Sequence, residues 1–384
     1  MEVAVIGGGP AGLRVAKETA EAGFDTIVLE KDRKIGRPVQ CAGLVSPRVI
    51  SMTGTESVVK EGYKAQIHPP KGEPLVLESE EPRAYIIDRG DFDRRMAMKA
   101  VACGARLELG ADVIDTTSYN GKREITYRKG GRKNKIDVDL VIGADGPTSL
   151  IRRKAGFPGP EEMLVGVQSI IAKEAKDIHI FLGKDISPDF FGWELPHPSG
   201  TLVGVASNDG DAYGHLKRLI DKRKFGDKII GYSAGTIPLG RVENSVKDGV
   251  MLVGDAACQV KPLSGGGLFP GLRSADICSE IAIDSLENRD TSEENLQEYH
   301  KRWQKDIGTE ISKGMWMRKI FKDISDEELS KMIHSLKDEK VKRVVESVGD
   351  IDYPSTLAKP VLKASPKLIK FAGPMIKNIF QPWE

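Results

Sequence analysis

The feature that most limits the fold of this chain is a glycine-rich turn between a short apolar strand and a helix. Residues 2–6 are predicted to form a buried strand, residues 10–22 a helix with one small apolar face, and residues 25–30 a second strand. A strand, a helix and a strand in this order indicate a parallel sheet. The opening of the chain therefore favours an α/β fold.

The turn has the sequence Gly7-Gly-Gly-Pro-Ala-Gly12. Gly7 allows the tight turn, Gly9 lets the backbone approach a diphosphate, and Gly12 lets the helix pack closely on the strand. The free N–H groups at the helix N-terminus then favour phosphate. Glu30 ends the second strand, where a carboxylate accepts hydrogen bonds from ribose hydroxyls. These residues predict a dinucleotide site; the alternative is a glycine-rich turn with a surface glutamate.

A second glycine-bearing signature lies far downstream and favours FAD over NAD. The predicted strand 250–253 is followed by Gly254-Asp255-Ala256-Ala257, and then by Gly265-Gly-Gly267-Leu268, which opens a helix. Asp255 can accept a hydrogen bond from a ribityl hydroxyl, a group that only a flavin has. Backbone N–H groups near Gly267 can face the N1/C2=O edge of an isoalloxazine. The alternative is that Asp255 caps a helix and that the glycines form a flexible loop.

A third turn, Gly143-Ala-Asp145-Gly146, lies between the other two and follows the alternating segment 136–143, which is predicted to form a strand. Asp145 can orient backbone near a cofactor or cap the helix that follows. We favour the capping role.

Composition excludes several other classes of protein. Lys and Arg number 57 and Asp and Glu 56, a formal net charge of +1, which argues against a general nucleic-acid binder. The four cysteines form no C-x-x-C pair, so neither a disulfide scaffold nor a metal site is expected, and Cys103, Cys258 and Cys278 are interpreted as structural. No apolar run is long enough to span a bilayer and no signal peptide is recognised, so a cytoplasmic location is expected.

The fold class expected is α/β with α+β elements, in three regions. Residues 1–61, 85–158 and 245–290 are predicted to form a discontinuous Rossmann-like FAD-binding domain. Residues 62–84 and 159–244 are predicted to form an inserted, mainly antiparallel substrate domain, and residues 291–384 a helical C-terminal region.

The three turns, in this order, resemble the FAD-dependent oxidoreductase superfamily that includes para-hydroxybenzoate hydroxylase. More narrowly, the chain resembles the geranylgeranyl reductase family, notably the archaeal digeranylgeranylglycerophospholipid reductases. Four segments carry that likeness: the cysteine loop Pro38–Leu44, the R-x-x-F-D-like segment Ile87–Asp93, the aromatic motif Pro188–Pro196 and the glycine loop Gly265–Leu268. The aromatic motif has Phe191 where the family usually has Tyr and Leu195 where it usually has Phe, and the cysteine loop is one residue shorter.

The resemblance implies an FAD-dependent reductase that saturates isoprenoid double bonds of membrane lipid precursors, by hydride from flavin N5 plus a proton. It implies FAD contacts at Gly7, Gly9, Gly12, Glu30, Cys41, Ala42, Gly43, Arg89, Val113, Asp255, Gly267 and Leu268. Alternatives are a flavin monooxygenase of the same superfamily and a flavoprotein electron carrier.

Two groups of side chains are candidates for the reaction itself. Phe190, Phe191 and Trp193 can form an apolar wall, with Phe191 and Trp193 against substrate; the alternative is ordinary core packing. The resemblance places Cys41 near the flavin as the candidate catalytic residue, in a proton relay or packed on the ring. The alternative is a small buried hydrophobe.

The expected partners are an isoprenoid lipid and an external electron donor. No second G-x-G-x-x-G unit follows a strand, so ferredoxin, a deazaflavin and NAD(P)H all stay open as donors. Residues 355–384 carry five lysines against one glutamate, interleaved with apolar side chains. This segment is a candidate for peripheral contact with the inner face of the membrane; the alternative is a cover packed on the protein.

Overall fold

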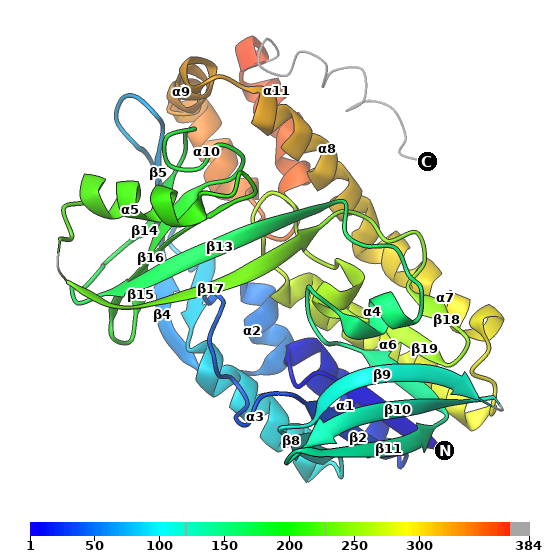
Figure 1. Cartoon of the computed structure of the whole chain (residues 1–384). Helices are drawn as coiled ribbons and strands as arrows, with labels where there is room; N and C mark the ends of the chain where they lie inside the picture. Colours follow the sequence, from blue (N-terminus) through cyan, green and yellow to red (C-terminus); the bar gives the residue numbers. More distant parts are fainter. Residues whose placement is uncertain (120, 227, 369–384) are drawn as a thin grey trace. The chain divides into compact units, whose positions relative to one another are not determined.

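The computed structural model describes residues 1–119, 121–226 and 228–368. Contacts group the chain into two compact units, each assembled from three separate segments (Figure 1). The first unit comprises residues 1–39, 89–163 and 236–312, and the second comprises residues 40–88, 164–235 and 313–384. The predicted division into three regions stays a prediction.

The first unit is built on a six-stranded sheet in the order β18-β19-β12-β1-β2-β8. All neighbouring strands are parallel except β18, which runs antiparallel to β19. Val3 pairs with Leu140 on one side and with Thr26 on the other, so β1 is central, and its apolar residues Val3 to Ile6 are buried. The strands are β1 (Glu2–Ile6), β2 (Asp25–Glu30), β8 (Arg106–Leu109), β12 (Leu140–Gly143), β18 (Val246–Lys247) and β19 (Val250–Leu252).

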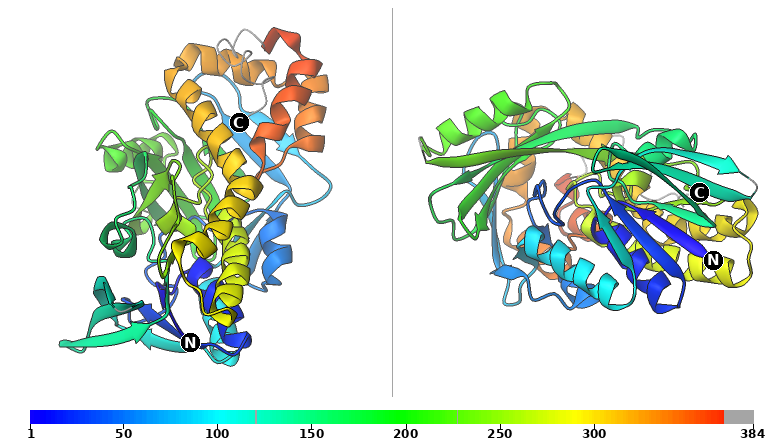
Figure 2. Two further views of the ribbon diagram at one scale, coloured as in Figure 1. Left: turned by 90° about the vertical axis from the view of Figure 1, so that its right-hand side faces the viewer. Right: turned by 60° about the horizontal axis from the view of Figure 1, so that its bottom comes forward.

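Helices α1 and α6 pack together in this unit. Ala11 of α1 lies close to α6, since a Cβ on Gly271 of α6 would lie 3.8 Å from the Ala11 Cβ, and Arg14 forms an ion pair with Asp276 at 2.7 Å. Its helices are α1 (Pro10–Glu21), α3 (Arg89–Ala102), α4 (Leu150–Lys154), α6 (Leu268–Glu287) and α7 (Glu293–Trp303). A second, three-stranded sheet lies beside the parallel one, and Figure 2 shows it in two views. Its strands are β9 (Asp112–Tyr119), β10 (Lys122–Lys129) and β11 (Arg132–Val138).

The second unit contains a seven-stranded sheet in the order β17-β13-β16-β15-β14-β5-β6, and a three-stranded sheet in the order β3-β7-β4. The larger sheet is antiparallel except where β14 runs parallel to β5. Its strands are β5 (Lys64–His68), β6 (Leu75–Glu78), β13 (Glu162–Ile171), β14 (Ile178–Phe181), β15 (Gly192–His197), β16 (Gly200–Ser207) and β17 (Ile229–Leu239). The smaller sheet contains β3 (Leu44–Val45), β4 (Val58–Gly62) and β7 (Ala84–Ile87).

Helix α5 (Ala212–Lys222) covers part of the larger sheet, because Leu216, Leu219 and Ile220 pack into a core with Val203 and Val205 of β16. The remaining helices of this unit are α2 (Pro47–Thr53), α9 (Asp326–Ser335), α10 (Glu339–Val348) and α11 (Ala358–Ala364). Helix α8 (Thr309–Asp323) begins in the first unit and continues into the second. Within the described ranges, no helix has the length and apolar character needed to cross a bilayer.

The α/β class is confirmed, and three local predictions can be compared with the structure. The segment 136–143 is divided between the end of β11 and the whole of β12, with Asp139 between them. The sequence predicts a helix at about 91–103, with Asp91 as its cap and Gly104 as its end. The cap is wrong, because α3 begins at Arg89, and Asp91 lies in its first turn and pairs with Arg95. Gly104 ends that helix as predicted, with a positive φ of 103° that favours glycine.

A histidine pair on the second unit's sheet predicts a pH dependence of stability. Nε2 of His68 lies 3.0 Å from Nδ1 of His179, and both rings stack with Phe181. Burial, together with the charges of His179 and Arg223, lowers the pKa of His68 to about 4. The unfolded chain therefore takes up this proton at higher pH than the folded protein does.

We expect the contribution of neutral His68 to be complete above pH 6.5 and to be lost as the pH falls towards 4. The unfolding free energy of wild type should fall by about 2 kcal/mol more than that of His68→Gln across this window, allowing for partial solvent screening. Urea denaturation at several pH values measures it, with His334→Gln on the exposed face of α9 as control. Parallel curves for wild type and His68→Gln would contradict the assignment.

Candidate functional site

Four turns of the first unit meet at one edge of its sheet. Strands β1, β2, β12 and β19 are parallel and end at Ile6, Glu30, Gly143 and Leu252, so their carboxyl ends share that edge. The chain order reverses between β1 and β12, since β2 lies on one side of β1 and β12 on the other. Ligands of open α/β sheets bind at such a reversal point, outside the carboxyl ends of the strands.

The first glycine turn is packed on one side and open on the other. A Cβ on Gly7 would lie 2.3 Å from the Ala144 carbonyl oxygen, and one on Gly12 would lie 2.4 Å from the Gly7 oxygen. By contrast, a Cβ on Gly9 would meet no atom within 4 Å. Gly9 is also the N-cap of α1 and no side chain caps this terminus. Space and free N–H groups are thus available where a diphosphate would bind.

Glu30 is tied to this turn. Its Oε2 accepts a hydrogen bond of 2.6 Å from the Gly8 N–H, and its Oε1 accepts one of 2.7 Å from the Asp32 N–H. Each carboxylate oxygen keeps a second lone pair for a hydroxyl donor. The ribose role of Glu30 stays a prediction.

The downstream turn approaches the first one through small residues. A Cβ on Gly254 would lie 3.0 Å from the Ala11 Cβ of α1, and a Cβ on Gly267 would lie 2.8 Å from Oδ1 of Asp255. Asp255 therefore lies against the start of α6. The N-cap residue of this helix is Gly267, which has no side chain to cap it. Burial of its carboxyl group raises the pKa of Asp255 to about 6, while the charge of Arg89 opposes the shift. A partly buried carboxylate at the start of a helix can accept a hydrogen bond from a ligand hydroxyl.

Buried polar side chains hold the downstream turn in place. Oε1 of Gln259 accepts a 2.7 Å hydrogen bond from the Gly254 N–H, and Nε2 of Gln259 donates to the Tyr299 hydroxyl at 2.9 Å. That hydroxyl donates to the Leu252 carbonyl at 2.8 Å. Neither Gln259 nor Tyr299 was predicted from the sequence, because neither belongs to a recognisable motif.

Asp145 caps α4, as predicted. Its carboxylate accepts hydrogen bonds from Ser149 Oγ at 2.5 Å and from the Leu150 N–H at 2.6 Å. Arg152 in the same helix donates to the carbonyls of Pro147 and Ala256 at 2.7 and 3.0 Å. This buried guanidinium joins the middle turn to the downstream turn, a role that the sequence did not indicate.

The other predicted contacts of the first unit lie on neighbouring elements. Arg89 starts α3 and forms a bidentate ion pair with Asp93, at 3.0 and 3.1 Å. Val113 lies on β9 and packs against the core that contains Ile27 and Leu29 of β2. Leu268 is the first residue of α6.

The cysteine loop belongs to the second unit. The Gly43 N–H lies 3.4 Å from Cys41 Sγ, and the Gly43 carbonyl accepts a 2.9 Å hydrogen bond from the Ile87 N–H. Cys41 and Cys103 are partly exposed, whereas Cys258 and Cys278 are buried. Burial raises the pKa of Cys258 to about 11 and that of Cys278 further, so neither provides a thiolate at neutral pH.

The aromatic motif forms a stacked group in the second unit. Phe190 is buried, Phe191 is partly exposed, and their ring centroids lie 4.2 Å apart. Trp193 meets Phe191 edge to face at 6.2 Å. The indole covers Gly204, where a Cβ would lie 2.4 Å from Cε2 and Cζ2, and its buried N–H has no partner among the described residues.

Comparisons with known proteins agree with this geometry. The family described as "FAD binding domain" matches residues 1–184. A digeranylgeranylglycerophospholipid reductase of Methanothrix thermoacetophila is 32% identical over 89% of this chain and 93% of the relative. Another, from Methanopyrus kandleri, is 31% identical over 98% of this chain and 99% of the relative.

Solved structures share the fold. A geranylgeranyl bacteriochlorophyll reductase-like protein of Thermoplasma acidophilum has a TM-score of 0.87 and 23% identity, covering 98% of this chain and 99% of its own. The flavin-dependent halogenase CmlS has a TM-score of 0.70 and 17% identity, covering 96% of this chain and 78% of its own. At these identities the likeness concerns the fold alone.

The fold and its converging turns define an FAD-dependent oxidoreductase, and the cradle at Gly9, Glu30 and Asp255 fits that cofactor. The similarity over nearly the whole length is more specific. The chain belongs to the digeranylgeranylglycerophospholipid reductase family.

Replacing Glu30 tests the ribose site. Glu30→Gln keeps the size of the side chain but removes the charge and one acceptor oxygen, so we expect FAD affinity to fall about 10- to 100-fold, the loss of one charge-assisted hydrogen bond. Titration of flavin-free protein with FAD, followed by quenching of flavin fluorescence, measures the dissociation constant. Asp25→Asn, at the opposite end of β2, is the matched control. Equal affinities for Glu30→Gln and wild type would refute the ribose role.

Proposed function

We propose that this enzyme saturates the isolated double bonds of geranylgeranyl chains in membrane lipid precursors. The observation that carries the proposal is the near full-length similarity to proteins named digeranylgeranylglycerophospholipid reductase. The turns that fit FAD and the apolar aromatic group support it, because the reaction needs a redox cofactor and a water-poor surface.

The chemistry explains why an aromatic group suits this substrate. An isoprenoid double bond is unpolarised, with no carbonyl to take up negative charge. Bound reduced FAD supplies hydride equivalents, and a proton must reach the other alkene carbon. Positive character then develops on the tertiary carbon, which aromatic faces stabilise.

The side chains of the second unit have separate tasks in this proposal. Phe191 and Trp193 hold the alkene in an apolar surrounding, and Leu195 is buried in the core. Phe191 has no hydroxyl, so it excludes water and donates no proton. The Cys41 thiol is the proposed proton donor, and water restores its proton after each turnover.

The electron donor and the membrane contact belong to the same proposal. A donor outside this chain, such as ferredoxin, a deazaflavin or NAD(P)H, reduces the cofactor. Lys359 and Lys363 of α11 and Lys367 provide positive charge for an anionic lipid surface. The remaining part of the basic segment, residues 369–384, lies outside the described residues.

A direct assay tests the proposed reaction. Holoenzyme reduced with dithionite under anaerobic conditions is incubated with digeranylgeranylglycerophospholipid in detergent, and the lipid is analysed by mass spectrometry. We expect products that gain one H2 per double bond and no oxygen. A lipid recovered unchanged would refute the proposal, and oxygen insertion under air would identify a monooxygenase.

Replacing Cys41 tests the proton donor. Cys41→Ala should lower kcat about 100-fold, the usual size of a lost general acid, and Cys41→Ser should recover part of the rate. FAD content, measured by absorbance, should stay unchanged. Cys103→Ala, at the other partly exposed cysteine, is the control and should keep full activity. A Cys41→Ala enzyme with wild-type kcat would leave the thiol with a packing role only.

A further inference from the structure

The aromatic motif begins in a segment without regular secondary structure. Residues 182–191 connect β14 to β15, so Phe190 and Phe191 are not held by a sheet ladder. The Phe190 N–H donates instead to Ser187 Oγ at 3.0 Å, and that hydroxyl donates to the Ala206 carbonyl at 2.6 Å. Side-chain contacts therefore decide where these rings lie.

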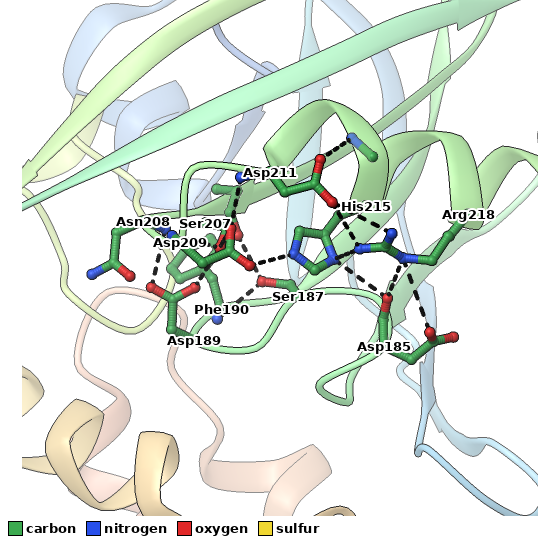
Figure 3. A network of polar contacts seen from close by, with 12 residues as sticks. Asp185, Ser187, Asp189, Phe190, Ser207, Asn208, Asp209, Asp211, His215 and Arg218 are labelled. Carbon is green, nitrogen blue, oxygen red and sulfur yellow. Dashed lines mark hydrogen bonds and ion pairs between the residues drawn. The ribbon is translucent and has the colours of Figure 1, made fainter.

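Asp189, the residue before Phe190, makes further polar contacts (Figure 3). Its Oδ1 lies 2.9 Å from the Ser207 hydroxyl, and its Oδ2 accepts a 3.2 Å hydrogen bond from the Asn208 N–H. The Ser207 hydroxyl also lies 2.8 Å from Oδ1 of Asp209, so one hydroxyl hydrogen serves two carboxylates. Two neighbouring carboxylates repel each other, and the buried one needs a cation.

Residues of helix α5 hold the carboxylate of Asp209 in place. Arg218 lies 2.6 Å from Nδ1 of His215 and must donate, which leaves Nε2 protonated to donate to Asp209 at 2.7 Å. Burial raises the pKa of Asp209, but hydrogen bonds from His215, Asp211 and Ser207 outweigh it and lower the pKa to about 2. Asp209 therefore stays charged beside Asp189.

Helix α8 supplies Arg318 as the cation for the Asp189 carboxylate. The Arg318 side chain is 2% exposed and that of Asp189 is 7% exposed. Arg318 donates to the Asp189 carbonyl at 2.6 Å and lies 3.4 Å from its Oδ2. The same guanidinium lies 5.6 Å from the Phe190 ring centroid, as a cation–π contact, and Phe190 stacks on Phe191.

We propose that Arg318 is a positioning residue that fixes the Phe190–Phe191 pair, and through it the edge-to-face contact with Trp193, in the conformation that receives the alkene. One guanidinium performs three tasks: it binds the backbone of Asp189, neutralises its carboxylate and covers Phe190. Lysine can neutralise the carboxylate but lacks the planar fork for the other two. The inference rests on the proposed function for its kinetic consequence alone, because the placement of the rings is a property of the chain.

The first test uses fluorine NMR and needs no activity. Holoenzyme containing 5-fluorotryptophan is compared as wild type, Arg318→Lys and Arg318→Gln, with Trp193→Phe and Trp303→Phe used only to assign resonances. We expect the Trp193 resonance to shift or broaden in both Arg318 variants while that of Trp303, in the first unit, stays unchanged. Arg48→Gln, which removes an ion pair to Asp350 in the same unit, is the control and should leave the Trp193 resonance in place.

The second test is a double-mutant cycle on lipid reduction. Arg318→Gln should lower kcat/KM about 10- to 100-fold, as expected for a misplaced contact surface, with partial recovery in Arg318→Lys. In a Phe191→Ala background the same change should alter kcat/KM by about twofold or less, since the residue it acts through is already gone.

The outcomes separate the two proposals. A Trp193 resonance unchanged in Arg318→Lys and Arg318→Gln, or full additivity with Phe191→Ala, overturns the positioning role. If Arg318→Gln does not fold, Arg318→Lys answers the same question. A wild-type enzyme that reduces no lipid refutes the proposed function, and the NMR comparison still decides the role of Arg318.

Discussion

Close backbone approach at the carboxyl edge of the parallel sheet is the constraint on which the candidate cofactor site depends. The turns after β1 and β12 touch because Gly7 has no side chain, and the turn after β19 reaches α1 because Gly254 and Ala11 are small. A Cβ at position 7 would overlap the Ala144 carbonyl, so any residue other than glycine there would push the two turns apart. Gly9, in contrast, keeps its free side towards open space, which is what a ligand requires.

Much of the first unit could be predicted from the sequence, because its signals are local. A strand, a glycine turn and a helix are adjacent in the chain, and Asp145 caps a helix that starts a few residues later. The predicted contact residues Glu30, Asp255 and Gly267 also lie at strand or helix ends. At such ends, the place of a residue in a sequence motif indicates its place in the fold. The assignment of these residues to FAD stays a prediction, which cofactor titration can decide.

Long-range polar contacts could not be predicted in the same way. Arg152, Tyr299 and Arg318 each donate to a carbonyl elsewhere in the chain, and Gln259 donates to the Tyr299 hydroxyl. A buried arginine looks in sequence like any surface arginine. Asp91 shows that local signals can also mislead. It is a favourable capping residue, but the helix begins two residues earlier and Asp91 lies in its first turn. Propensity describes a residue's neighbours in sequence, whereas these roles depend on neighbours in space.

The interleaved order of segments has a consequence for biosynthesis. Strand β1 is made first, but its sheet is complete only after β19 has left the ribosome, and Arg318 follows Asp189 by more than a hundred residues. Neither unit can reach its final packing while the nascent chain lacks its last third. Such late closure of distant contacts slows folding and extends the time during which apolar strands are exposed. The residues from β1 to β19 that flank the candidate cofactor site therefore come together only late in synthesis.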